Sequence, residues 1–165
     1  MSFRGADQGG SNSAAPARDG LRGAGDPGRL RASAHLALPR QIDIRWNDLD
    51  GYGHVNQAIY VTYGEESLDA WFRERLELGE DRSWDYVAAK TTIEYRSELR
   101  IADGPAVATV ELVRLGTKSV TTRTTVAAAD GRIAAELENV VVAIDGMGGE
   151  SRALTDQERT ALTAD

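Results

Sequence analysis

One long helical pattern followed by four strand-like segments is the feature that most restricts the fold of this chain. Between residues 58 and 75, apolar side chains recur every three to four positions. This spacing predicts a helix of about five turns that begins near Asn56 and ends near Gly79. Four segments rich in Val, Thr, Ile and Tyr come next, at 84–96, 106–113, 119–128 and 132–144. The pair Asp130-Gly131 indicates a tight turn between the last two. Short connections favour an antiparallel sheet with the helix on one face, an α+β fold class.

An acidic loop with glycines joins a predicted first strand to this helix. Apolar and polar residues alternate over 36–46, which predicts a strand whose buried face carries Ile42, Ile44 and Trp46. Asn56 is expected to be the helix N-cap, because its side-chain oxygen can accept a hydrogen bond from a first-turn amide and leave other amides for a ligand. Such a helix end attracts negative charge, including charge that develops in a transition state. The loop therefore places a carboxylate, Asp50, and an imidazole, His54, close to a helix N-terminus.

Two further local patterns give structural expectations. Gly64 lies inside the predicted helix, where glycine costs about 0.5–1 kcal/mol relative to alanine, so it indicates the close approach of a neighbouring element. Near the end of the chain, Thr155 and Glu158 have the spacing of a capping box. They predict a short helix over 155–161.

Composition limits the domain organisation and the partners. The 165 residues are 41% hydrophobic, which suffices for one domain, expected over 35–145. Residues 1–34, rich in Gly, Ala, Ser, Arg and Asp, are expected to be a disordered tail, and 146–165 a flexible segment that contains the short helix. The net charge of −7 and the lack of a basic run argue against nucleic acid or an anionic membrane as partner. The absence of cysteine excludes thiol catalysis, and the absence of a signal or membrane-spanning pattern favours a cytoplasmic protein.

The residues from Asp48 to Tyr60, DLDGYGHVNQAIY, resemble the signature of the hotdog-fold acyl-CoA thioesterases related to 4-hydroxybenzoyl-CoA thioesterase. The similarity continues through TTIEYR at 91–96 and VRLGTKS at 113–119. It implies a hotdog fold, in which a curved antiparallel β-sheet is wrapped around one long central α-helix. The family usually has a second asparagine where this chain has Gln57. Because hotdog domains pair their sheets side by side, the resemblance also implies a homodimer or homotetramer.

The resemblance implies an acyl-CoA thioesterase with a carboxylate and a main-chain donor in its site. Asp50 stands at the position of the catalytic carboxylate, and the amide near Gln57 at that of the donor to the thioester oxygen. Direct attack by Asp50 and activation of a water molecule both fit the sequence. His54 can bond the carbonyl, position water, orient Asp50 or tie the loop to the main chain. The candidate catalytic residues are thus Asp50, His54, Asn56 and Gln57, with no cofactor beyond the coenzyme A of the substrate.

Substrate contacts are expected in two places. Aromatic and small residues near the motif would shape the acyl pocket, namely Tyr52, Gly53 and Tyr60. Coenzyme A carries phosphates, so cationic and hydroxyl groups are expected near the mouth of the site, above all Thr117, Lys118 and Ser119, with Arg96 and Arg100 also available. Asp48 is expected to be structural, with its carboxylate bonded to loop amides.

Other chemistries fit the residues less well. A calcium loop that began at Asp48 would need an oxygen ligand at Tyr52 and a bidentate glutamate at Ile59, so calcium is excluded. A zinc site has no support, since the chain has no cysteine and its two histidines, His35 and His54, are far apart. Two alternatives to the thioesterase are a non-catalytic module that binds acyl-CoA or acyl-carrier protein, and a hotdog dehydratase, whose differently spaced pattern is absent. The acyl chain is not determined by the sequence.

Overall fold

The computed structural model describes residues 39–79, 82–146 and 148–164, so the expected tail over 1–34 lies outside the described residues. The helices and strands are β1 (Arg40–Ile42), α1 (Ile59–Arg75), β2 (Tyr86–Tyr95), β3 (Ala106–Leu115), β4 (Ser119–Ala127), β5 (Ile133–Ala143) and α2 (Asp156–Thr163), with short 3₁₀ helices at Trp46–Asp48 and Ile101–Asp103. No helix among these residues is long and apolar enough to cross a membrane.

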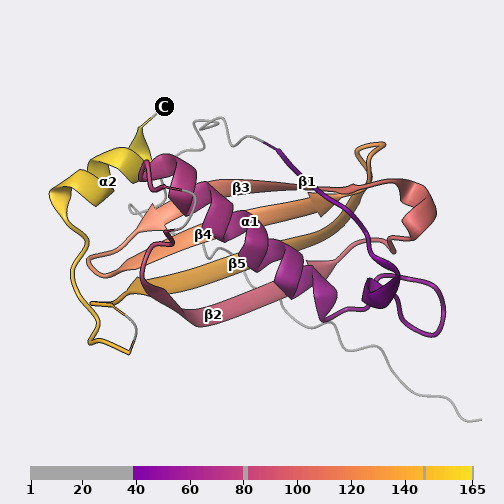
Figure 1. The fold of residues 1–165 in the computed structure, drawn as a ribbon, viewed down its shortest axis with the longest axis horizontal. Helices are drawn as coiled ribbons and strands as arrows, with labels where there is room; N and C mark the ends of the chain where they lie inside the picture. The colour runs from indigo at the N-terminus through magenta and orange to yellow at the C-terminus, as the bar shows by residue number, and fades with distance from the viewer. Residues whose placement is uncertain (1–38, 80–81, 147, 165) are drawn as a thin grey trace, which may run out of the picture.

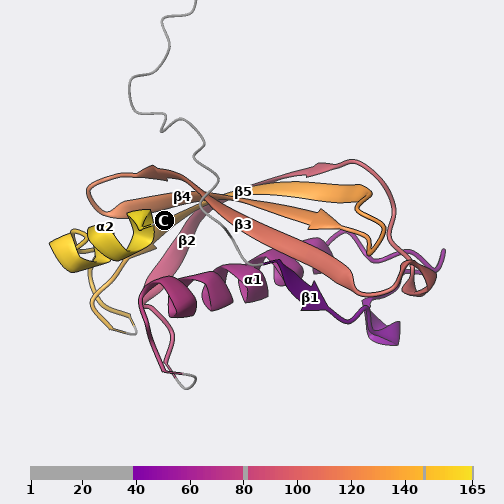
Figure 2. The same ribbon diagram turned by 90° about the horizontal axis from the view of Figure 1, so that it is seen from above.

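The five strands form one antiparallel sheet in the order β1-β3-β4-β5-β2. Helix α1 runs along one face of this sheet, and the sheet curves around it (Figures 1 and 2). Alternate residues of β4 and β5 are buried, as expected for strands with one face on a core. This arrangement confirms the α+β hotdog fold.

Two core clusters follow α1 along its length. The first, here the N-terminal core cluster, surrounds the start of the helix and includes Val55, Tyr60, Tyr63, Leu99 and Leu137. The second, the C-terminal core cluster, surrounds its end and includes Leu68, Trp71, Phe72, Trp84 and Leu162. Gly64 lies between them, where a Cβ atom would come within 2.9 Å of Leu137 Cδ2. The expected close approach at this glycine is confirmed.

The first strand is shorter than the sequence pattern predicts. Strand β1 pairs with β3 only from Arg40 to Ile42, and Trp46, expected on the buried face, is 80% exposed. The cause is Asp48, whose carboxylate accepts the Arg45 main-chain N–H at 2.9 Å and closes a 3₁₀ turn where the strand was expected to continue. The prediction for Trp46 was therefore wrong.

Helix α1 has the expected length but a later start. Its N-cap is Ala58, without a side-chain cap, so the prediction of Asn56 as N-cap was wrong. Asn56 instead closes a tight turn just before the helix: its Oδ1 accepts the Ala58 N–H at 3.0 Å, and its carbonyl accepts the Ile59 N–H at 2.9 Å. The helix ends at Arg75, before Gly79, and Glu77 adopts a positive φ of 49° just beyond it.

The C-terminal segment packs on the domain. Thr155 caps α2, with both hydrogen bonds of the predicted capping box to Glu158 present. Leu154 and Leu162 are buried in the C-terminal core cluster. The short helix is confirmed, and it extends the packed unit beyond residue 145.

Candidate active site

Asp48 anchors the loop that carries the site. Its buried carboxylate accepts hydrogen bonds from the Arg45 main chain and from the Tyr63 hydroxyl, the latter at 2.8 Å. Burial alone would raise the pKa of Asp48, but the hydrogen bonds from Arg45 and Tyr63 outweigh it and hold that pKa below its ordinary value. The Asp48 carbonyl also accepts the Asn56 N–H at 2.8 Å. Asp48 thus ties both ends of the loop together, the structural role expected from the sequence.

Asp50 sits inside a tight turn of the same loop. Its Oδ1 accepts the Tyr52 N–H at 2.8 Å and the His54 N–H at 3.1 Å, and its own N–H donates to the His54 carbonyl at 2.8 Å. The hydrogen bond from Tyr52 contributes most to lowering the pKa of Asp50, so the side chain is a carboxylate at neutral pH. Oδ2 has no hydrogen-bond donor among the described residues and is available for chemistry.

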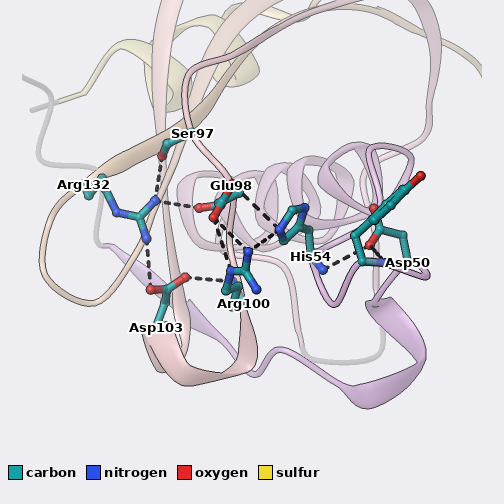
Figure 3. Close-up of polar contacts among 8 residues, drawn as sticks. Asp50, His54, Ser97, Glu98, Arg100, Asp103 and Arg132 are labelled. Atoms are coloured by element: carbon teal, nitrogen blue, oxygen red, sulfur yellow. Dashed lines mark hydrogen bonds and ion pairs between the residues drawn. The ribbon is translucent and has the colours of Figure 1, made fainter.

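The imidazole of His54 contacts the guanidinium of Arg100 through Nε2, and the Glu98 carboxylate lies 3.8 Å from the same nitrogen (Figure 3). A guanidinium only donates hydrogen bonds, so in this contact His54 Nε2 is the acceptor. Glu98 also pairs with Arg100 at 3.1 Å. The ring of His54 is therefore fixed from one side by an ion pair, whereas its main chain holds Asp50.

A second ion-pair group holds the segment that faces His54. Arg132 donates to the Ser97 hydroxyl at 2.8 Å and pairs with the Asp103 carboxylate at 3.0 Å, and Asp103 accepts the Arg100 N–H at 2.7 Å (Figure 3). These contacts come from the β4–β5 turn and the connection after β2. The partners of His54, Glu98 and Arg100, are thus positioned by the connection after β2 and by the β4–β5 turn, and not by the loop that carries Asp50.

Just before α1, the Gln57 main-chain donor is unpaired among the described residues. The amides on either side have acceptors: the Val55 and Asn56 N–H groups donate to carbonyls of Leu99 and Asp48, and the Ala58 N–H donates to the Asn56 side chain. Within the described part of the chain, the Gln57 N–H has no acceptor. Gln57 is exposed, so this donor is open to a ligand.

These groups border one pocket of about 510 Å³. Its lining comes from the loop, the start of α1 and the end of β2 with the residues after it, and consists of Asp50, His54, Val55, Asn56, Gln57, Tyr60, Tyr95, Arg96, Ser97 and Glu98. The ring of Tyr60 is buried and makes an edge-on contact with Tyr95, with ring centroids 5.6 Å apart. The pocket thus joins a carboxylate, an unpaired amide and an aromatic wall.

The structure brings together some of the predicted site residues and separates others. Asp50, His54, Asn56, Gln57 and Tyr60 line the pocket, whereas Tyr52 and Gly53 lie on the loop beside it, Tyr52 with 84% of its surface exposed. The other predicted contacts lie at the opposite end of the sheet, at the β3–β4 turn, and are Thr117, Lys118 and Ser119.

At that turn the Lys118 ammonium donates to the Ser151 carbonyl at 2.9 Å, and Arg159 of α2 donates to the Gly116 carbonyl at 2.8 Å. These hydrogen bonds join the turn to the C-terminal segment. Within this chain, then, the β3–β4 turn does not reach the pocket.

Sequence reasoning missed Tyr95 and Glu98, which line the pocket beside Asp50 and Gln57. One signal was present for Tyr95. Strand alternation places it on the same face as Ile93, which packs against the N-terminal core cluster. Arg96 and Arg100, named as cations for a phosphate, do lie at or beside the pocket but are paired, Arg96 with Glu136 at 2.8 Å.

The described residues include no group of three or more His, Asp or Glu side chains placed to hold a metal ion.

Comparison with known proteins identifies a family. A model described as the thioesterase-like superfamily matches residues 44–160. A thioesterase from Thermus thermophilus, complexed with coenzyme A and zinc, is 28% identical with a TM-score of 0.67, over 76% of this chain and 97% of that one. No curated protein matches the chain.

Two more distant structures share the fold. The SAV2348 protein of Staphylococcus aureus, in complex with CoA, has a TM-score of 0.67 at 17% identity, over 81% of this chain and 85% of its own. Slr0204, a 1,4-dihydroxy-2-naphthoyl-CoA thioesterase from Synechocystis, has a TM-score of 0.62 at 13% identity, over 75% of this chain and 93% of its own.

Proposed function

Since the chain belongs to the thioesterase-like superfamily, we propose that it hydrolyses acyl-CoA thioesters to a free carboxylic acid and coenzyme A. One observation carries the proposal: Asp50, an ionised carboxylate, and Gln57, whose N–H has no acceptor among the described residues, line the same pocket. Thioester hydrolysis needs a base or nucleophile beside the carbonyl carbon and a fixed donor for the oxyanion, and these two groups meet both needs.

In the proposed reaction the thioester carbonyl oxygen accepts a hydrogen bond from the Gln57 N–H. Asp50 Oδ2 either takes a proton from a water that attacks the carbonyl carbon, or attacks that carbon itself to form an anhydride that water then opens. In both routes the C–S bond breaks, the thiolate leaves as coenzyme A and one water is consumed. A single oxyanion donor is worth about 10²–10³ in rate and a general base about 10²–10⁴.

We assign His54 and Asn56 to positioning. The main-chain N–H of His54 holds Asp50 Oδ1, while its ring fixes Arg100 at the edge of the pocket. The side chain of Asn56 occupies the Ala58 amide, whereas the neighbouring Gln57 N–H has no acceptor among the described residues. Tyr60 would contact the acyl group.

Release of free thiol from a panel of acyl-CoA esters tests this proposal. Asp50→Asn is expected to lower kcat by at least about 10²-fold and to lower the unfolding midpoint only slightly, because Asn keeps an oxygen that accepts the Tyr52 and His54 N–H groups. Asp130→Asn is a matched control, because Asp130 also accepts a main-chain N–H two residues ahead, that of Arg132, but lies in an exposed turn. Wild-type turnover in Asp50→Asn would overturn the assignment, and tight binding in calorimetry with no thiol released would favour the non-catalytic binding module instead.

We further propose that the reaction needs no metal or other cofactor. Carboxylate, amide and water account for each bond that forms or breaks in the scheme above. Dialysis against EDTA should therefore leave kcat unchanged. A loss of turnover that added zinc restores would contradict this.

We propose that the protein acts as a homodimer or homotetramer. Strand β2 is an edge of the sheet, and nearly all of its residues are exposed, including Val87 and Tyr95 at about half of their surface. A long uncovered edge invites pairing with another strand, and a second copy of this sheet would cover it. Light scattering during size exclusion should give at least twice the monomer mass of 17.8 kDa.

A further inference from the structure

Two successive peptide groups at the start of α1 are held at three of their four polar atoms. In the first, the Asn56 carbonyl accepts the Ile59 N–H at 2.9 Å. In the second, the Ala58 N–H donates to Asn56 Oδ1 at 3.0 Å, and the Gln57 carbonyl accepts the hydroxyl of Tyr95 at 3.0 Å. The fourth atom is the Gln57 N–H, the proposed oxyanion donor.

Tyr95 reaches this peptide from a different part of the fold. It is the last residue of β2, and it pairs with Ala135 of β5 in the sheet. Its ring leans edge-on against Tyr60, which is 3% exposed. The phenol is therefore positioned by the sheet and by the N-terminal core cluster, independently of the loop that carries Asp50.

We propose that Tyr95 is a positioning residue for the reaction: its hydroxyl fixes the Gln57–Ala58 peptide and so directs the Gln57 N–H at the thioester oxygen. This inference rests on the proposed function. The hydrogen bond to the Asn56 carbonyl holds the peptide before Gln57 Cα, and the hydrogen bond from Tyr95 holds the peptide after it. Both torsions around Gln57 Cα are therefore constrained. An oxyanion donor acts only within about 2.7–3.1 Å of its target, and a misplacement of about 1 Å can cost about 10²-fold in rate.

The hydroxyl is proposed to act on kcat rather than on substrate binding. Gln57 is exposed, so without the hydroxyl its carbonyl would hydrogen-bond to water, and the peptide would be held only through the Ala58 N–H, on Asn56 Oδ1, and would be oriented less precisely. The ground-state thioester gains little from a precisely aimed donor, whereas the oxyanion of the transition state depends on it.

Tyr95→Phe tests the inference, because it keeps the ring contact with Tyr60 and removes only the hydroxyl. We expect kcat for acyl-CoA hydrolysis to fall by about 10-fold to 100-fold, with KM within about twofold of wild type. The acid side of the pH profile, set by Asp50, should not move, since the groups bonded to Asp50 are untouched.

Tyr86→Phe is the matched control. It also removes a tyrosine hydroxyl that donates a hydrogen bond, at 2.8 Å to Asp69, but it lies in the C-terminal core cluster. Its kcat should equal that of wild type. Wild-type kcat in Tyr95→Phe, a change confined to KM, or equal losses in the two variants would overturn the inference. Asp50→Asn, assayed in parallel, separates the two proposals: its inactivity beside a fully active Tyr95→Phe would reject only the role of Tyr95.

Discussion

The two ends of α1 use a similar hydrogen bond in different surroundings. At the start of the helix the Tyr63 hydroxyl donates to Asp48 at 2.8 Å, and near its end the Tyr86 hydroxyl donates to Asp69 at the same distance. The first bond is buried and anchors a loop. The second is half-buried and borders a group of rings in tilted and edge-on contact, those of Trp71, Phe72, Trp84 and Tyr86.

The polar groups of the two ends differ in how fully they are paired. Near the end of α1, Glu158 accepts from Arg152, from Trp84 Nε1 and from the Thr155 N–H, so its carboxylate is occupied on both oxygens. At the start of α1, neither Asp50 Oδ2 nor the Gln57 N–H has a hydrogen-bond partner among the described residues. We infer that one end of the helix contributes chiefly to stability and the other to chemistry. The following predictions test this division.

The largest effect is expected from Phe72→Ala. Phe72 is fully buried, and its ring centroid lies 4.4 Å from that of Trp84 and 5.3 Å from that of Tyr86. Removal of the ring should lower the free energy of unfolding by about 3–5 kcal/mol, measured by urea denaturation. The protein that remains folded should keep its kcat, because none of the residues that line the pocket belongs to this cluster. A lower kcat per folded molecule would show that the two ends are coupled.

A comparison of Asp48→Asn with Asp69→Asn should give the next largest difference. Asp48→Asn removes a buried charge that accepts from Arg45 and Tyr63, so we expect a loss of about 1.5–3 kcal/mol in unfolding free energy and a fall in kcat, since the loop carries Asp50. Asp69→Asn keeps an acceptor for Tyr86 and should cost under about 1 kcal/mol, with no change in kcat. Denaturation and thiol release on both variants check this. Equal effects on kcat would remove the functional distinction between the ends.

The sequence could predict what depends on neighbouring residues along the chain. The helix over 58–75, the turn at Asp130-Gly131 and the capping box of Thr155 with Glu158 are all local patterns, and all are present. The grouping of Asp50, His54 and Gln57 also follows from proximity in sequence.

What the sequence could not predict depends on competition or on register. Trp46 has the spacing of a buried strand residue, but the Asp48 carboxylate competes for the main chain and turns it outward. Tyr95 meets Gln57 only because β2 pairs with β5 in one particular register, which brings residues 38 positions apart into contact. Lys118 lies far from the pocket because consecutive antiparallel strands place the β3–β4 turn at the end of the sheet opposite to the β4–β5 turn.

A smaller effect is expected from Glu158→Gln, on how the free energy of unfolding depends on pH in the acid range. Burial raises the pKa of Glu158, but the hydrogen bonds from Arg152, Thr155 and Trp84 outweigh it and lower that pKa to about 2, from 4.5. Because the folded pKa is depressed, Glu158 contributes its full stability above about pH 4.5 and loses it progressively as the pH falls toward 2. Glu158→Gln should therefore be less stable than wild type at pH 7, with the difference shrinking between pH 4.5 and 2. Urea denaturation at several pH values measures this, and a constant difference would contradict it.

The smallest effect is expected at Gly64, where the two core clusters meet. Alanine is favoured over glycine in a helix by about 0.5–1 kcal/mol, but its Cβ would lie 2.9 Å from Leu137 Cδ2, so the end of that side chain must move. Because Leu137 can rotate and the contact is not with main chain, the gain and the cost should nearly cancel, and Gly64→Ala should change the unfolding free energy by less than about 1 kcal/mol. Gly64→Val adds two further methyl groups and a β-branch at this close contact, so its loss should exceed that of alanine by about 1–3 kcal/mol. Equal stability of the two variants would show that α1 does not contact β5 closely at Gly64. The contact at Gly64 would then not fix the position of α1 on the sheet.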